Sequence, residues 1–221
     1  MNLYEAIEGR RDIRHFRPDP IGPEVLARIL LAAHHAGSVG FMQPWNFIVI
    51  DDIEMRREIR RHVESERLRA AEAFEGPRRE KYLSFKLEGI LDAPINLCVT
   101  CDRSRSGPAV LGRYTIPETD IYSTCCAIQN LWLAARSEGV GVGWVSILET
   151  AFIRNTLGIP EHVFPVAYLC LGYPYTFPQK PMLETEGWLP RVHLNELVYN
   201  NAWGNKTAGA LSAAIEKATL I

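Results

Sequence analysis

Residues 120–147 read "DIYSTCCAIQNLWLAARSEGVGVGWVSI", a pattern that predicts a long helix followed by a strand. Residues 120–139 predict a helix that is apolar nearly all round and rich in small side chains, so it should lie centrally and pack tightly. Gly139 is expected to end the helix, and residues 140–147 predict a strand. A dinucleotide-binding glycine loop must follow a strand and open a helix, because the phosphate sits at the helix N-terminus. The reversed order here argues against a Rossmann site.

Helical and strand patterns continue on both sides of this stretch. Pro23 and Gly37 bound an amphipathic helix over residues 22–37. A loop at 38–46 and a surface excursion at 103–118 carry the turn-forming residues. Further helices are predicted at 4–11, 53–74, 77–94 and 149–158, and strands at 47–51, 95–102 and 163–173. The pattern predicts one α+β domain in which helices outnumber strands. The end of the chain, 205–221, is either helical or frayed.

The composition is that of an ordinary globular protein. The chain has 221 residues, of which 47% are hydrophobic and 23% charged, and a formal net charge of −2. This balance gives no basic bias toward nucleic acid or a membrane surface. No apolar run approaches the roughly 18 residues of a membrane span. The N-terminus "MNLYEAIEGRR" carries charges where a signal peptide has its apolar core, so a cytoplasmic location is expected.

The cysteines and histidines offer little support for metal chemistry. The cysteine count is five, and Cys98 and Cys101 form a CxxC inside the strand-like "INLCVTCD". Residues three apart on a strand point to opposite faces, and two further zinc ligands at matching spacing are lacking. Buried structural thiols are therefore expected, with redox or metal use as the alternative. His34 and His35 are adjacent on a helix and diverge, and the sequence contains neither HExxH nor GxSxG before a helix.

Residues 10–16, "RRDIRHF", form the first candidate site. Arg10 and Arg14 are spaced i, i+4, so both are expected to point the same way from a last helical turn. Converging guanidiniums match the oxygens of a phosphate. The alternative is a basic turn that faces water.

The second candidate is the loop "SVGFMQPWNF", residues 38–47. A surface loop seldom carries so many large apolar side chains unless it covers something. Gln43 and Asn46 add amides that both donate and accept hydrogen bonds, which would suit the edge of a flat heteroaromatic ligand. The alternative is a loop packed onto the protein's own core.

Together these motifs resemble the flavin-dependent nitroreductase family. The order is "RRxxR" (Arg10, Arg11, Arg14), then "AxS…QPWxF", a glycine-rich strand at 141–146, and a terminal "R…L…LV" that begins at Arg191. Longer motifs, among them "KYLSFKLEGI", "CVTCDR" and "LCLG", resemble one branch of the family, the 5,6-dimethylbenzimidazole synthases of the BluB type. This resemblance covers about residues 3–204, which predicts one nitroreductase-like domain at 1–204 and a C-terminal tail at 205–221 outside the family pattern.

Two departures separate this chain from common nitroreductases. Those enzymes usually have Asn at the position of Phe41 and a hydroxy amino acid at the position of Asp12. Both differences favour the synthase branch. The main alternative that stays open is an NAD(P)H-dependent FMN nitroreductase, and a protein that binds FMN without turning it over is a third.

The resemblance implies a fold, a reaction and a set of partners. The fold would be a mostly antiparallel central sheet flanked by helices, in an intertwined homodimer with FMN at the subunit interface. The enzyme would be an oxidoreductase that uses molecular oxygen to fragment reduced FMN into 5,6-dimethylbenzimidazole, the lower ligand of vitamin B12, and erythrose 4-phosphate. A separate flavin reductase would supply the reduced FMN for this step of cobalamin biosynthesis.

The resemblance also assigns roles to residues. Arg10, Arg14 and Arg191 would clamp the FMN phosphate. Arg11 would reach the ribityl chain or ring edge, and Lys86 would contact the ring. A wall contributed by the dimer partner would consist of Ser38, Gly40, Gln43, Pro44, Trp45 and Asn46.

Two residues are candidates for catalysis. Ser146 would lie against the reactive centre of the flavin, near N5 and C4a. Asp12 is the main candidate for the proton transfers that ring fragmentation needs, and the neighbouring guanidiniums favour a base role first. Phe41 and Met42 would help to seal the pocket.

Overall fold

The structure, a computed structural model, describes residues 1–219. Its chain forms two compact units, Met1–Gln179 and Lys180–Ile221, which are described here one at a time. Residues 220 and 221, the end of the predicted tail, lie outside the described residues.

The first unit is built on a four-stranded sheet. Its strands are β1 (Trp45–Ile50), β2 (Ile95–Asp102), β3 (Gly141–Val145) and β4 (Val163–Gly172). The order is β1-β2-β4-β3, and each neighbouring pair is antiparallel. The predicted antiparallel sheet is therefore confirmed. β1 and β3 form its two edges.

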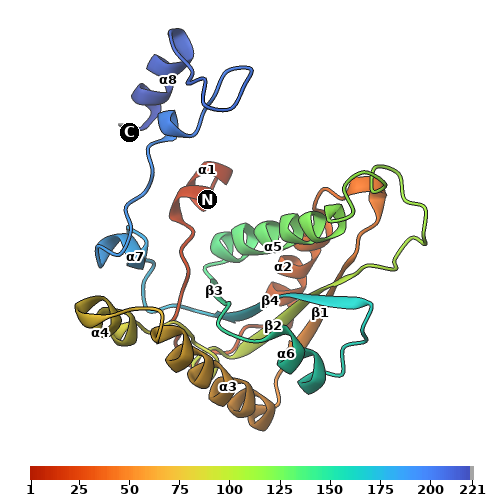
Figure 1. Cartoon of the computed structure of the whole chain (residues 1–221). Helices are drawn as coiled ribbons and strands as arrows, with labels where there is room; N and C mark the ends of the chain where they lie inside the picture. Colours follow the sequence, from red (N-terminus) through yellow and green to blue (C-terminus); the bar gives the residue numbers. More distant parts are fainter. Residues whose placement is uncertain (220–221) are drawn as a thin grey trace. The chain divides into compact units, whose positions relative to one another are not determined.

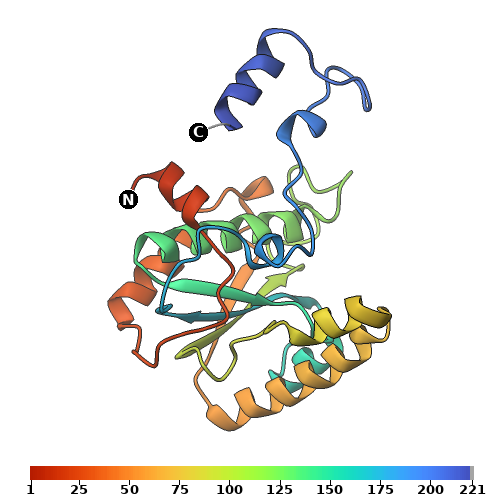
Figure 2. The ribbon, with the colours of Figure 1, turned by 90° about the vertical axis from the view of Figure 1, so that its left-hand side faces the viewer.

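Helices cover both faces of this sheet (Figures 1 and 2). The helices α2 (Pro23–His34) and α5 (Thr119–Ser137) lie on one face, and α3 (Ile53–Ala71) and α6 (Thr150–Thr156) on the other. Each strand contributes side chains to the cores on both faces, because successive side chains point to opposite faces. Leu97 and Val99 join the α5 core, and Cys98 between them joins the α3 core.

The helix α5 is central, as residues 120–139 predict. Its buried positions include Thr124, Ala127, Ile128 and Leu131, and it contacts α1 (Leu3–Gly9), α2 and the strands β2 and β3. Small side chains at the contacts let these neighbours approach closely. Gly139 follows the helix with φ +74°, so its role as the stop is confirmed.

Most of the predicted helices are shorter in the structure, and two of them end early in ways that affect the candidate site. The helix predicted at 4–11 ends at Gly9, because Arg10 is already extended with φ −67° and ψ 132°. The helix predicted at 77–94 is α4 (Gly76–Ser84) and stops well before Pro94. In the stretch after α4, the buried guanidinium of Arg56 donates to the carbonyls of Ile90 (3.1 Å) and Ala93. These tertiary hydrogen bonds replace the helical ones.

The second unit is mostly irregular. It contains α7 (Met182–Thr185), the 3-10 turn η2 (Leu194–Glu196) and α8 (Ala210–Thr219). Asn195 joins η2 to α8 by donating to the Ser212 carbonyl (3.4 Å). The end of the chain, left open as helical or frayed, is thus helical over 210–219. The domain boundary at 204 stays a prediction, since a division into compact units does not test the family pattern.

Within residues 1–219, every helix is too short or too polar to span a membrane.

Candidate active site

The segment "RRDIRHF" is extended, so its arginines do not sit on a last helical turn as expected. It runs beside β3: the Ile13 N–H donates to the Val142 carbonyl (3.0 Å), and Asp12 forms a parallel bridge to Val142. Side chains two apart in an extended chain share a face. Arg10, Asp12 and Arg14 therefore share a side for a different reason than predicted, while Ile13 is buried on the other side.

Asp12 is held by three donors. Both terminal nitrogens of Arg14 donate to its two carboxylate oxygens, and the Trp144 N–H donates to Oδ1 (2.9 Å). Arg14 also donates to the Trp144 carbonyl (3.2 Å). The Arg14 side chain is 13% exposed and that of Asp12 is 43% exposed. The carboxylate is therefore fixed in orientation but open to a ligand.

The glycines of β3 make this arrangement possible. A Cβ on Gly143 would lie 2.1 Å from the Ile13 carbonyl oxygen, and one on Gly141 would lie 2.8 Å from Ile13 Cγ1. Real Cβ atoms do not approach so closely. The glycines that resemble a dinucleotide-binding pattern thus allow the Asp12 segment to approach β3 closely.

Arg10 is the guanidinium best placed to take an anion. Its Cζ lies 4.6 Å from the ring centroid of Trp132, a cation–π contact that fixes the side chain. Within residues 1–219 it has no carboxylate partner in an ion pair. The fork of Arg14, by contrast, already holds Asp12. Arg191 is exposed and belongs to the second unit, so its place in a phosphate clamp stays a prediction.

The remaining cationic candidates approach the same segment. Arg11 donates to the carbonyls of Glu8 (2.5 Å) and Gln179. Lys86 pairs with Asp92 on the irregular stretch after α4. That stretch lies against "RRDIRHF", since a Cβ on Gly89 would lie 3.1 Å from the Arg14 carbonyl oxygen.

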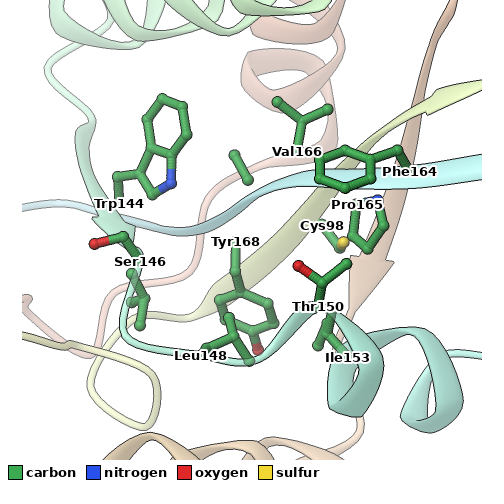
Figure 3. A pocket seen from close by; sticks show the side chains of 12 residues that line it. Cys98, Trp144, Ser146, Leu148, Thr150, Ile153, Phe164, Pro165, Val166 and Tyr168 are labelled. Atoms are coloured by element: carbon green, nitrogen blue, oxygen red, sulfur yellow. The ribbon is translucent and has the colours of Figure 1, made fainter. Parts of the chain in front are cut away.

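Ser146 follows β3 directly and lines a pocket of about 290 Å³. Figure 3 shows Trp144 and Ser146 on one side of this pocket, Thr150 and Ile153 of α6 on the other, and Tyr168 between them. The pocket is largely apolar. Burial raises the pKa of the Tyr168 hydroxyl, which donates to Asn96 Oδ1 (2.8 Å). The Trp144 N–H thus donates to Asp12, and Ser146 follows Trp144 by two residues in the chain.

The loop at 38–46 has unusual backbone geometry. Gly40, Phe41 and Gln43 all have positive φ (+56°, +54° and +48°), which residues other than glycine seldom adopt. Ser38 Oγ accepts the Gln43 N–H (2.9 Å), so Ser38 serves the turn itself. The side chain of Phe41 is 80% exposed.

The other side chains of this loop are occupied within the chain. Trp45 is buried and donates from Nε1 to His34 Nδ1 (3.2 Å), and Met42 and Pro44 are buried too. Asn46 donates to Thr100 Oγ1 (3.3 Å) and accepts from Arg105 through Oδ1. Both ends of its amide are used, which leaves Gln43 as the amide open to a ligand.

Arg105 was missed by the sequence reasoning. It lies in the excursion at 103–118, which reads as a surface loop, yet it donates to the carbonyls of Gln43 (2.8 Å) and Trp45 (3.0 Å). The "RSR" run in "CDRSRSG" directly after a buried strand was the available signal.

The two candidate clusters lie at opposite edges of the sheet. Asp12 and Ser146 accompany β3, whereas the loop at 38–46 leads into β1. Two strands stand between these edges, a separation of about 14 Å at the usual strand spacing. One copy of the first unit therefore does not bring the clusters together.

The cysteines on β2 are buried and reduced, as expected of structural thiols. Burial raises the pKa of the Cys98 thiol to about 12 and that of Cys101 to about 11. Thiolate chemistry at neutral pH is disfavoured at both.

One group of His and Glu side chains has its ligand atoms within 4.8 Å of one another: His62, Glu66 and Glu149. The guanidinium of Arg69 binds both glutamates, and His62 Nε2 accepts the Glu149 N–H (3.2 Å). These atoms are already engaged within the protein, so the group carries no argument for a metal.

The sequence and its relatives place the chain in a family. The chain belongs to the nitroreductase family, whose model matches residues 7–173. It is 44% identical over 191 residues to a 5,6-dimethylbenzimidazole synthase of Rhodospirillum rubrum, covering 86% of this chain and 90% of the relative. A 5,6-dimethylbenzimidazole synthase of Rhodobacter capsulatus is 39% identical over 186 residues, which cover 84% of this chain and 90% of the relative.

Solved structures share the fold. An iodotyrosine deiodinase bound to FMN and 3-iodo-L-tyrosine superposes with a TM-score of 0.70 at 23% identity, over 91% of this chain and 99% of that one. The NADPH:FMN oxidoreductase of Vibrio harveyi gives a TM-score of 0.67 at 21% identity, over 100% of this chain and 85% of that one. At such identities the likeness concerns the fold alone.

Proposed function

We propose that the chain is a 5,6-dimethylbenzimidazole synthase. It converts reduced FMN and molecular oxygen into 5,6-dimethylbenzimidazole, the lower ligand of vitamin B12, and erythrose 4-phosphate. Its similarity to synthases of that name extends over most of the chain at 36–44% identity. The structural observation that carries the proposal is Asp12, a fixed and accessible carboxylate that accepts a hydrogen bond from the N–H of Trp144, two residues before Ser146.

Asp12 is suited to moving protons. Ring fragmentation needs several proton transfers, and a positioned carboxylate contributes about 10²–10⁴-fold to such a step. Arg14 and the Trp144 N–H hold this carboxylate in one orientation, so little reorganisation is needed when it takes a proton. Ser146 is exposed beside this pocket, and its hydroxyl can both donate and accept hydrogen bonds.

The residues of the Asp12 region fit FMN. Arg10, fixed on Trp132 and without a carboxylate partner in residues 1–219, would hold the phosphate together with Arg191. Arg14 would add charge to the same site while it orients Asp12. Arg11 and Lys86 would contact the ribityl chain and the ring. Bound FMN, which is consumed as the substrate, supplies the carbon atoms of the benzimidazole and the electrons for oxygen.

A homodimer would complete the site. The wall of Ser38, Gly40, Gln43, Pro44, Trp45 and Asn46 lies at the β1 edge, away from Asp12, so a second copy would have to supply it. Exposed apolar side chains surround this wall and support an interface: Phe41, Leu111 (87% exposed) and Tyr114 (96% exposed). FMN would then lie between the subunits of an intertwined pair.

The supply of reduced FMN would come from a separate flavin reductase. Five reduced cysteines fit the reducing environment of the cytoplasm, where such a reductase would operate.

Incubation with reduced FMN in air, followed by mass spectrometry of the products, tests the proposed function. We expect 5,6-dimethylbenzimidazole in amounts that follow the loss of FMN. Intact FMN without the benzimidazole would refute the proposal. A related NAD(P)H nitroreductase, represented by a relative 32% identical over 178 residues, would instead bleach bound FMN with NADPH and restore its colour with a nitroaromatic compound.

A further inference from the structure

The loop that carries the wall at the β1 edge has a strained backbone, and contacts with the rest of the chain must stabilise it. Phe41 and Gln43 have left-handed backbones, and each such residue costs on the order of 1 kcal/mol or more. Strained residues persist only where the surroundings over-determine them. For Gln43 the surroundings are specific: its N–H is bound by Ser38 Oγ, and its carbonyl is bound by Arg105.

Arg105 binds three residues of the wall: Gln43, Trp45 and Asn46. One terminal nitrogen bridges the Gln43 carbonyl (2.8 Å) and the Trp45 carbonyl (3.0 Å), and the other donates to Asn46 Oδ1. The Gln43 carbonyl lies in the irregular turn, and Trp45 begins the edge strand. The guanidinium thus provides donors where the turn lacks regular backbone partners.

The excursion at 103–118 fixes Arg105 in place. The Asp102 N–H donates to the Pro44 carbonyl (2.7 Å), and Asp102 Oδ1 accepts the Ser104 N–H (2.9 Å), which forms a tight turn. Arg103 pairs with the buried Asp120 (3.1 Å) at the start of α5. Arg113 closes the excursion by donating to the Arg103 carbonyl (3.0 Å). The excursion is therefore tied at both ends, and Arg105 is directed at the wall.

We propose that Arg105 is a positioning residue for the flavin wall. Arg105 holds Gln43 toward the ligand and thereby keeps the oxygen chemistry coupled to ring fragmentation. This inference rests on the proposed function. The amide of Asn46 already donates to Thr100 and accepts from Arg105, so Gln43 would make the hydrogen bond to the flavin edge. The long contact of Gln43 Nε2 with the Phe41 carbonyl (3.5 Å) holds that amide only weakly.

A loosened wall would change the products. When water and oxygen have free access, reduced FMN passes two electrons and two protons to O₂, which gives oxidised FMN and hydrogen peroxide. When the wall is closed, the same oxygen is used for fragmentation. The ratio of benzimidazole to hydrogen peroxide therefore measures the state of the wall.

The test compares Arg105→Met and Arg105→Lys with the wild type. Arg57→Met is the matched control, because Arg57 is an exposed arginine of α3 that pairs only locally with Glu54. Each protein is assayed for its dissociation constant for oxidised FMN, its ratio of benzimidazole to hydrogen peroxide, its unfolding temperature and its oligomeric state.

We expect Arg105→Met to weaken FMN binding about tenfold, as befits the loss of charge-assisted hydrogen bonds, and to shift the products toward hydrogen peroxide. Arg105→Lys should fall between, because an ammonium group lacks the planar fork. Arg57→Met should match the wild type. If Arg105→Met kept the wild-type product ratio and FMN affinity, the role of Arg105 would be merely structural and the inference would be wrong.

Two further measurements keep the result interpretable. Ser38→Ala removes the opposite tether of Gln43 and should shift the products in the same direction, which covers the case in which Arg105→Met does not fold. If the wild type itself forms no benzimidazole, the proposed function fails, while the FMN affinities of the variants still decide whether Arg105 positions the wall.

Discussion

The two edges of the sheet carry the two parts of the proposed site, and they are built in different ways. At the β3 edge the Asp12 segment is extended and unstrained, and it packs against glycines that leave it room. At the β1 edge the wall has left-handed residues other than glycine and is held by hydrogen bonds from outside the turn.

The difference in backbone geometry would suit the two roles proposed for these edges. A group that transfers protons has to keep its position, so it benefits from a relaxed and crowded backbone. A wall that admits a substrate and then covers it benefits from a conformation held by a few polar contacts. Each of the following changes perturbs one edge and leaves the other intact.

The largest effect is expected from Asp12→Asn at the β3 edge. Product formation should fall by about 10²–10⁴-fold, because the amide is no longer a base, while FMN binding is retained. Mass spectrometry of the benzimidazole and a fluorescence titration with FMN measure the two quantities. Asp19→Asn, at an exposed carboxylate paired with Arg17, is the control. Retained product formation in Asp12→Asn would remove Asp12 from the mechanism.

Mixing two inactive variants tests whether the edges meet across subunits. A dimer of one Asp12→Asn chain and one Arg105→Glu chain has one site with both an intact Asp12 and an intact wall. Random mixing should restore about a quarter of the wild-type sites, since half of the dimers are mixed and each has one intact site in two. If co-refolded chains are no more active than either variant alone, the wall does not act in trans.

Gly143→Ala should destabilise the fold itself. A methyl group 2.1 Å from the Ile13 carbonyl oxygen would force the Asp12 segment off β3. We expect the free energy of unfolding to fall by about 3 kcal/mol, measured by urea denaturation. The control is Gly37→Ala, where a Cβ meets no atom within 4 Å, and its change should stay within about 0.5 kcal/mol. Equal effects of the two substitutions would contradict the close-approach explanation.

Phe41→Gly should uncouple stability from activity at the wall. Glycine relieves the left-handed strain, and the exposed ring loses little packing, so stability should rise by up to about 1 kcal/mol. The product ratio should shift toward hydrogen peroxide because the pocket is less well covered. Asn201→Gly, at φ +65° in the second unit, is the control, since Asn already tolerates this conformation. A lower unfolding temperature for Phe41→Gly would speak against strain.

The smallest effect concerns pH and Asp102. Burial tends to raise the pKa of its carboxyl, but the Ser104 hydrogen bonds and the charge of Arg105 outweigh this and lower the pKa below 3.8. A lowered pKa contributes stability that is present above pH 3.8 and is lost as the pH falls through the folded-state value. Asp102→Asn should therefore lower the unfolding temperature by about 1–2 °C at pH 7, with a difference that shrinks below about pH 4. A difference independent of pH would exclude this carboxylate as its source.

The motifs pick out Arg10, Asp12 and Ser146, and their roles in the site stay predictions. The structure shows that the Trp144 N–H donates to Asp12, two residues before Ser146 in the chain. The helical turn expected at Arg10 was wrong, because pairing with β3 overrides local helix propensity. Arg105 escaped prediction because the "RSR" run does not show which atoms its guanidinium reaches. These are two backbone carbonyls and the Asn46 Oδ1 atom, about 60 residues away in the chain.

From the sequence, periodicity predicted the helices, the strands and the central position of residues 120–139, and the long motifs predicted the family together with its antiparallel sheet. The structure added that the glycines of β3 admit the Asp12 segment, that Arg105 and Thr100 engage both ends of the Asn46 amide, and that the clusters lie at opposite sheet edges. These features depend on contacts between residues that are far apart in the sequence, and spacing along a sequence does not specify such contacts.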